Sequence, residues 1–254
     1  MKGKQWEILL YETENYLRLQ NMKLAIMQPY FLPYIGYFQL LATVDKFVLL
    51  DDVNYINRGW INRNRLLLNG AAHTFTIPLI GASQNKHICE IELVTENNWR
   101  EKLLRTIQLA YAKAPCYSKV FAVLEKIITY PSKQLDDFLL HSICEIAKYL
   151  SLEDTKIVRT SRDYNNQNLK GQERILDICL QEKADVYINP IGGVDLYDKN
   201  TFLEKGIQLH FLQSRPITYQ QGKCEYVPWL SILDVLMYNE ISVVQQLLFE
   251  ADQL

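Results

Sequence analysis

The chain has 254 residues, 48% of them apolar and 22% charged, which is enough for a buried core and excludes intrinsic disorder as the general state. Its 27 Lys and Arg residues against 29 Asp and Glu residues leave a formal net charge of −2, which excludes the broadly positive surface of a DNA-binding protein. No apolar run approaches the ~20 residues of a membrane span, and the five scattered cysteines contain no C-x-x-C pair, so free thiols in a reducing cytoplasm are expected.

The first 21 residues lack the basic and apolar segments of a signal peptide and are polar and weakly amphipathic instead. Met22 stands directly before a strand-like segment and is a candidate start of the functional chain. We therefore expect residues 1–21 to be a lead that is either non-native or loosely packed. Residues 22–254 contain no repeat, low-complexity tract or Pro/Gly linker, which favours a single domain.

Predicted strands and helices alternate on both sides of the middle of this domain, as they do in parallel α/β sheets. Residues 23–27 and 46–50 predict two buried strands, and the segment 35–43 joins them as a helix, which makes a parallel βαβ unit. Further strands are predicted over residues 74–78, 88–94, 156–160, 185–188 and 207–212. Further helices are predicted over residues 172–181, 199–205 and 231–248.

The middle of the chain, residues 97–150, has helical periodicity throughout. Apolar residues recur at helical spacing over 98–113, 116–129 and 132–150, and Ser132 is the expected N-cap of the third helix. We therefore predict an α/β fold with a mostly parallel, Rossmann-like three-layer sheet and a helical insertion around residues 97–150.

A turn with two prolines follows the first predicted strand and opens the first helix, over residues 28–37. In open α/β sheets ligands bind in the crevice at the carboxyl ends of the strands, and a helix N-terminus there attracts anions. Gln28, Tyr30 and Gly36 are therefore candidate substrate-binding residues. The alternative is a rigid connection whose aromatic side chains only fill the core.

A charged segment follows the second predicted strand. Asp51 and Asp52 end that strand and are the candidate catalytic residues, either as a general base or as Mg²⁺ ligands. Guanidinium groups bind phosphate through paired hydrogen bonds, which makes this basic segment a candidate substrate-binding site. Its candidate residues are Arg58, Asn62, Arg63 and Arg65. The alternative is a solvated loop whose charges pair with one another.

Two later loops, each after a predicted strand and before a helix, carry further candidate substrate-binding residues. Ser161, Gly171 and Arg174 suit a phosphate, because they offer a hydroxyl, free backbone N–H groups and a cation. Gly192 and Gly193 permit the close approach of a ligand. Ordinary helix capping and turn formation are the alternatives for both loops.

The segment before the last predicted helix has a mainly structural pattern. Ser231 is the expected N-cap, and Asp234 would complete a capping box. Tyr219 and Gln221, which precede this cap, are candidate residues at the rim of a site. The four histidines have no metal-binding spacing, so no protein metal site is predicted.

Laid end to end, these segments resemble the WbqC-like family over nearly all of residues 22–240. The resemblance rests mainly on the Q-P-x-x-x-P-x-x-G-Y-F string of residues 28–38 and the W-x-N-R-N-R string of residues 60–65. This sequence departs from the family at Met27, where members commonly carry His, so an acid or base role of that His does not transfer. A looser similarity is to cytidylyltransferase-like nucleotide-binding folds, whose paired histidines are absent from the turn.

The resemblance implies a place in surface-polysaccharide (O-antigen or lipopolysaccharide) or modified-sugar biosynthesis, where some such proteins are proposed to attach an amino acid to an amino sugar. We therefore hypothesise a cytoplasmic transferase that N-acylates an amino sugar, expected to be nucleotide-linked. The sequence leaves the donor open between aminoacyl-tRNA, acyl-CoA and an acyl-adenylate.

Two alternatives to this transferase stay open. One is a nucleotidyltransferase-like enzyme that uses a nucleoside triphosphate with Mg²⁺ at Asp51 or Asp52, and the other is a non-catalytic binding protein of a polysaccharide pathway. No cofactor is obligatory on the first hypothesis, and Mg²⁺ enters only with a triphosphate. Neither DNA nor membrane insertion is expected, and a homo-oligomer is compatible with the sequence.

Overall fold

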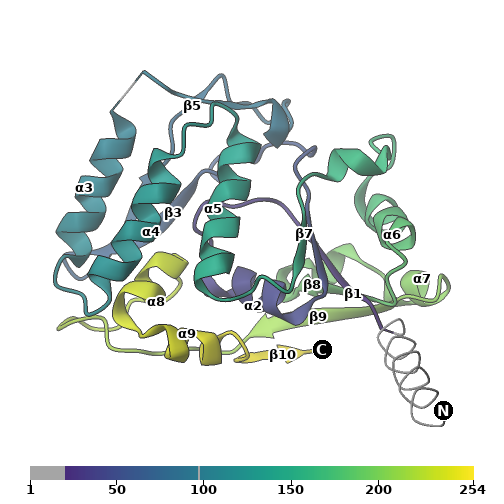
Figure 1. Cartoon of the computed structure of the whole chain (residues 1–254). Helices are drawn as coiled ribbons and strands as arrows, with labels where there is room; N and C mark the ends of the chain where they lie inside the picture. Colours follow the sequence, from purple (N-terminus) through teal and green to yellow (C-terminus); the bar gives the residue numbers. More distant parts are fainter. Residues whose placement is uncertain (1–20, 97) are drawn as a thin grey trace, which may run out of the picture.

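The computed structural model describes residues 21–96 and 98–254, and its centre is a six-stranded sheet in the order β10-β9-β8-β1-β2-β7 (Figure 1). Its strands are β1 (Lys23–Met27), β2 (Lys46–Leu49), β7 (Lys156–Val158), β8 (Val186–Pro190), β9 (Gln208–Ser214) and β10 (Ala251–Gln253). All neighbouring strands are parallel except β9 and β10. The predicted α/β class with a mostly parallel sheet is confirmed, whereas the predicted lead lies outside the described residues except for Asn21.

Successive side chains of the central strands enter two separate cores, one on each face of the sheet. Leu24 and Ile26 of β1 belong to one core, and Ala25 between them belongs to the other. The first core is covered by α6 (Gly171–Gln181) and α7 (Lys199–Leu203). The second is covered by α2 (Ile35–Thr43), α3 (Trp99–Tyr111), α4 (Tyr117–Thr129), α5 (Leu135–Tyr149) and α8 (Ile232–Tyr238) (Figure 1). Helices on both faces are what a buried parallel sheet requires.

The strand order changes direction at β1. The chain passes from β1 through α2 to β2 on one side, whereas β8, on the other side of β1, follows β7 and α6. The connection after β1 therefore turns to one face of the sheet and the connection after β8 turns to the opposite face. The crevice that opens between two such connections is where open α/β sheets bind ligands.

The predicted strand over residues 74–78 is shifted and lies outside the main sheet. Residues 71–76 form β4, which pairs with β3 (Arg63–Leu68) in an antiparallel hairpin. The strand ends before Pro78, which has no N–H group to donate to a partner strand.

The predicted strand over residues 88–94 is wrong. This segment contains a 3-10 helix (Ile88–Glu90) and the short strand β6 (Glu92–Leu93), which pairs with β5 (Leu79–Ile80). A regular ladder does not form because the N–H groups of Ile88 and Cys89 donate to the carbonyl oxygens of Val53 and Asp51, each at 3.0 Å.

The helical insertion is confirmed as α3, α4 and α5, but its predicted cap is wrong. α5 begins at Leu135, and Ser132 instead forms a local turn, with its hydroxyl accepting from the Gln134 N–H at 3.1 Å. The predicted C-terminal helix is divided into α8 and α9 (Ile241–Leu247). The division falls where Cys116, at the start of α4, bonds the carbonyl oxygens of Met237 and Asn239.

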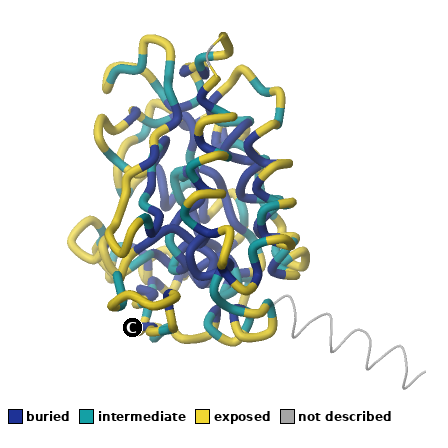
Figure 2. Tube along the Cα trace, turned by 90° about the vertical axis from the view of Figure 1, so that its left-hand side faces the viewer, coloured by how far each residue is buried: buried dark blue, intermediate teal, exposed yellow. Residues whose placement is uncertain are grey.

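The buried residues run through the centre of the molecule and exposed ones surround them (Figure 2). The five cysteines are free thiols, as predicted. Among the helices of residues 21–254 that the structure describes, none is both long and apolar enough to cross a membrane.

Candidate functional site

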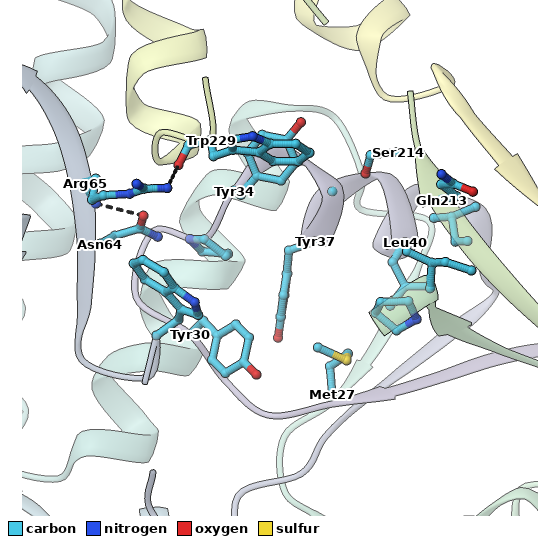
Figure 3. A pocket seen from close by; sticks show the side chains of 16 residues that line it. Met27, Tyr30, Tyr34, Tyr37, Leu40, Asn64, Arg65, Gln213, Ser214 and Trp229 are labelled. Carbon is cyan, nitrogen blue, oxygen red and sulfur yellow. Dashed lines mark hydrogen bonds between the residues drawn. The ribbon is translucent and has the colours of Figure 1, made fainter. Parts of the chain in front are cut away.

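A cavity of about 500 Å³ opens at the carboxyl ends of β1, β8 and β9, at the change in strand order (Figure 3). We call it the switch-point cavity. Its walls are mainly aromatic and aliphatic. They consist of Met27, Tyr30, Pro33, Tyr34, Gly36, Tyr37, Leu40, Trp60, Asn64, Arg65, Pro190, Ile191, Leu212, Gln213, Ser214 and Trp229. Of the predicted substrate-binding residues, Tyr30, Gly36 and Arg65 line this cavity.

Two tyrosines present phenol groups to the switch-point cavity. The Tyr37 hydroxyl donates to the Gln28 carbonyl oxygen at 3.2 Å, and the Tyr30 hydroxyl donates to the Gln28 side-chain oxygen at 3.3 Å. Burial raises the pKa of both phenols, that of Tyr37 well above its ordinary value. Both therefore stay neutral near pH 7, and Gln28 acts by orienting them from behind the cavity wall.

The turn after β1 is held in a strained conformation. Leu32 has a φ of +43°, in the left-handed region that bulky residues seldom occupy. Its carbonyl oxygen accepts hydrogen bonds from the Asn64 amide at 2.8 Å and the Ser231 hydroxyl at 2.7 Å. Both asparagines of the W-x-N-R-N-R string therefore make structural hydrogen bonds. Asn62 is buried and bonded to Tyr55 and Ile77, and its substrate-binding role stays a prediction, whereas Asn64 also lines the switch-point cavity.

Gly36 allows α2 to approach β9 closely. A Cβ atom at this position would lie 2.6 Å from the Ser214 hydroxyl oxygen and 3.3 Å from the Tyr34 ring. An alanine at this position would therefore force the Ser214 hydroxyl to rotate away from the wall of the switch-point cavity.

We expect Gly36→Ala to lower the free energy of unfolding by at most about 1 kcal/mol, because the Ser214 hydroxyl can rotate to relieve most of the contact with the added methyl. Ser214→Ala in the same chain removes the hydroxyl and should recover part of that loss. Urea denaturation of both single variants and the double variant measures this. An equal loss in the Gly36→Ala and double variants would contradict the proposed contact.

Two arginines of β3 lie beside the Trp60 ring. The guanidinium carbons of Arg63 and Arg65 are 5.7 and 5.4 Å from its centroid. Arg65 also donates to the Trp229 carbonyl oxygen at 2.9 Å, as Figure 3 shows. Trp229 has a φ of +60° and packs on Tyr34 with ring centroids 5.3 Å apart. Arg65 therefore connects the two tryptophans of the cavity rim.

A second cluster lies at the carboxyl ends of β2 and β7, and its members do not line the switch-point cavity. Asp52 pairs with Arg174 at 2.6 Å and also accepts from the Ser161 hydroxyl. Burial would raise the pKa of Asp52, but the hydrogen bonds from Ser161 and Arg174 and the charge of Arg174 hold it below its ordinary value. Asp52 and Arg174 are 4% and 6% exposed, so they form a buried ion pair.

Both carboxylate oxygens of Asp51 have partners. Its carboxylate accepts from the Thr160 hydroxyl and the Ser161 N–H at 2.9 Å, and Arg162 lies 3.2 Å away. Guanidinium groups lie beside both carboxylates at positions where a cation would bind, which disfavours Mg²⁺ there. Oδ2 of Asp52, however, is buried and has no hydrogen-bond partner among the described residues. The catalytic role of these two residues stays a prediction.

The remaining predicted substrate-binding residues do not line the switch-point cavity. The Tyr219 hydroxyl donates to buried Asp234 at 2.7 Å, which also explains why Asp234 forms no capping box. Ser231 is confirmed as the N-cap of α8, accepting from the Leu233 N–H at 3.2 Å. Gly193 lies against Asn189, whose amide nitrogen would be 2.0 Å from an added Cβ. Gly171 begins α6, and Gly192 has open space around it.

Several cavity residues were not among the predicted site residues. Gln213 and Ser214 were missed because β9 extends two residues past its predicted end. Trp229 was placed in a structural segment, although it is 58% exposed and lies on the cavity rim. An exposed tryptophan next to a predicted cap was the available signal.

The fold and the cavity define an α/β protein with a cavity at the change in strand order of a mostly parallel sheet. The chain belongs to the WbqC-like protein family, whose model matches residues 28–246. It is similar to "Uncharacterized protein Rv1507c" of Mycobacterium tuberculosis, at 28% identity over 221 residues, which cover 84% of this chain and 92% of that protein. No solved structure matches the chain.

Proposed function

We propose that the chain binds an amino sugar in the switch-point cavity as the acceptor of an acyl or aminoacyl group. The observation that carries the proposal is an aromatic cavity of about 500 Å³ whose polar groups are neutral except for one guanidinium. Cavities of this size enclose small ligands and use a few polar groups to orient them.

The side chains of the cavity suit a sugar ring. The faces of Tyr30, Tyr34 and Trp229 can cover the C–H groups of the ring, as aromatic side chains do with apolar surface. Tyr37, Ser214 and Gln213 offer hydrogen bonds to its hydroxyl groups. This combination supports a carbohydrate over a purely apolar ligand.

The cavity would also favour the reactive form of the acceptor. Desolvation in this mainly aromatic cavity disfavours an ammonium group and so lowers the pKa of a bound amine. The neutral amine attacks the carbonyl carbon of an activated acyl donor, the leaving group departs with the bonding electron pair, and the nitrogen loses a proton to water. On this proposal a base at Asp51 or Asp52 is unnecessary.

The finer features of the proposal draw on the family and the strand order. Counted along the chain, the parallel strands have the spatial order 3-2-1-4-5, which supports a Rossmann-like, nucleotide-binding architecture. Membership of the WbqC-like family supports a cytoplasmic role in surface-polysaccharide or modified-sugar biosynthesis. We keep aminoacyl-tRNA, acyl-CoA and an acyl-adenylate as candidate donors.

Binding is tested by calorimetric titration of the wild type with glucosamine and other amino sugars. We expect Trp229→Ala to weaken the affinity about tenfold, or ~1.4 kcal/mol, because it removes one wall of the cavity. The control is Leu109→Ala, a side chain 80% exposed on α3. Absence of amino-sugar binding, or equal affinity of all three proteins, would contradict the proposed site.

Transfer is tested by incubating the protein with the bound amino sugar and each candidate donor, followed by mass spectrometry. Formation of an amide with the mass of sugar plus acyl group supports a transferase. Sugar binding without product from any donor would favour a binding protein instead. Pyrophosphate release from a triphosphate would favour a nucleotidyltransferase, against which the pairing of Asp52 with Arg174 speaks.

A further inference from the structure

Positive charge without a matching carboxylate gathers at the mouth of the switch-point cavity. Arg63 and Arg65 lie beside the Trp60 ring of the cavity wall, and neither has a carboxylate within 4.0 Å in the part of the chain that the structure describes. Arg58, which precedes them in the sequence, has none either. By contrast, Arg162, Arg174 and Arg215 each have an acidic partner. The mouth of the cavity therefore keeps a local positive potential although the whole chain is slightly acidic.

Backbone carbonyl groups orient these guanidinium groups without neutralising them. Arg63 donates through Nε to the Gly59 carbonyl oxygen at 2.9 Å and through Nη2 to that of Arg58. Arg65 donates through Nη2 to the Trp229 carbonyl oxygen at 2.9 Å. Because a guanidinium has five N–H groups, each arginine retains donors for a ligand.

One N–H donor of Arg65, at Nε, has no hydrogen-bond partner among the described residues. This nitrogen atom is buried, and lacking a partner there is a costly state for a charged group. Arg65 and Trp60 both line the switch-point cavity, and Arg63 lies against the same indole ring. We call Arg63, Arg65 and Trp60 the arginine strip.

We propose that the arginine strip binds the diphosphate of a nucleotide-linked amino sugar whose sugar ring occupies the switch-point cavity. The inference rests on the proposed function and adds the chemical class of the acceptor. Two oriented cations match the two phosphates of a diphosphate, whereas a single carboxylate would leave one of them uncompensated. Arg63 and Arg65 are two residues apart on β3, so both side chains stand on the same face of the hairpin.

The experiment compares calorimetric titrations with glucosamine, UDP-glucosamine and inorganic pyrophosphate at about 50 mM and about 500 mM salt. We expect the wild type to bind UDP-glucosamine at least about tenfold more tightly than glucosamine. This advantage should shrink at high salt, and pyrophosphate should compete for UDP-glucosamine binding. Glucosamine affinity should change less with salt, because glucosamine has no phosphate for the two arginines to bind.

The variants separate a ligand site from a structural brace. Arg63→Gln should lose most of the diphosphate advantage and keep its glucosamine affinity within about twofold, whereas Arg63→Lys should keep part of the advantage because it keeps the charge. The control is Arg105→Gln, on an arginine 77% exposed on α3. Thermal unfolding checks that each variant is folded. If Arg63→Gln does not fold, Arg65→Gln provides a second test.

The outcomes distinguish this inference from the proposed function. Equal wild-type affinity for glucosamine and UDP-glucosamine would overturn the inference and leave the sugar site standing. Equal weakening of both ligands by Arg63→Gln would also overturn it, since the arginine would then act only as a brace. Binding of UDP and pyrophosphate without glucosamine would support the strip and contradict the sugar site, and binding of none of them would overturn both.

Discussion

Asp52→Ala is expected to lower the free energy of unfolding by about 3–5 kcal/mol, which is the usual cost of removing one partner from a buried ion pair. The variant leaves the Arg174 guanidinium buried without a counter-charge, and the Ser161 hydroxyl loses an acceptor. For a chain of this size the midpoint of thermal unfolding should fall by about 6–20 °C. Arg174→Met should cost a similar amount, and the double variant should cost less than the sum, because the two residues are coupled.

Urea denaturation of the two single variants and the double variant measures this coupling. Arg215→Gln is the matched control, because Arg215 is 51% exposed and solvent screens its ion pairs with Glu250 and Asp252, so this variant should stay close to the wild type in stability. If Asp52→Asn keeps full stability while amide formation is lost, the residue is catalytic, as the sequence alone predicts. If Asp52→Asn instead loses stability while its folded fraction still binds the amino sugar, the structural role of Asp52 is favoured.

Asp234→Ala is expected to cost about 3–6 kcal/mol, because it leaves three buried donors without an acceptor at about 1–2 kcal/mol each. The carboxylate is 0% exposed and accepts at 2.7 Å from the Tyr111 hydroxyl, the Tyr219 hydroxyl and the Gln221 amide. These bonds join α3 and the segment before α8, and Tyr111 also accepts from the N–H of Leu67 in β3. Asp234→Asn keeps the shape and should stay within about 1.5 kcal/mol of the wild type at pH 7.

The two Asp234 variants also differ in pH dependence. Burial raises the pKa of Asp234, although the three hydrogen bonds oppose that effect. The stability contributed by the protonated carboxyl is therefore fully present below its unfolded pKa of ~3.9, and it is lost as the pH rises through the higher folded value. Asp234→Asn should therefore gain stability relative to the wild type as the pH rises through the folded pKa of Asp234. Urea denaturation of both proteins at a series of pH values measures this difference. A difference that is constant with pH would contradict the raised pKa.

The five parallel strands of the main sheet could be predicted from the sequence because they are short, mostly buried and bounded by polar turns, whereas the antiparallel edge strand β10 was missed. Residues 23–27 form β1 as expected, and the change in strand order follows from the two connections on opposite faces. The hairpin of β3 and β4 was harder to predict, because long-range bonds from Asn64 and Ser231 hold the turn beside it. Local periodicity contains no information about such contacts.

The site was predicted in part for the same reason. The turn after β1 supplies Tyr30 and Gly36, whose role follows from their position after a strand. Asp52 and Arg174 are both charged residues next to loops. They are 122 positions apart in the sequence, which does not show that they form an ion pair in the folded chain. Trp229 and Ser214 reach the cavity from the other end of the chain, which only the folded structure reveals.

Two of the four tryptophans of the chain, Trp60 and Trp229, lie on the rim of the cavity, whereas Trp99 is 6% exposed in the core. The intrinsic fluorescence of Trp60 and Trp229 can therefore report on ligand binding in the cavity. A ligand that enters it changes the polarity around two indoles and should shift or quench their emission, while Trp99 supplies a constant background. Collections of sugars, nucleotides and acyl donors can be screened in this way without a label, and Trp60→Phe and Trp229→Phe assign the signal to one side of the opening.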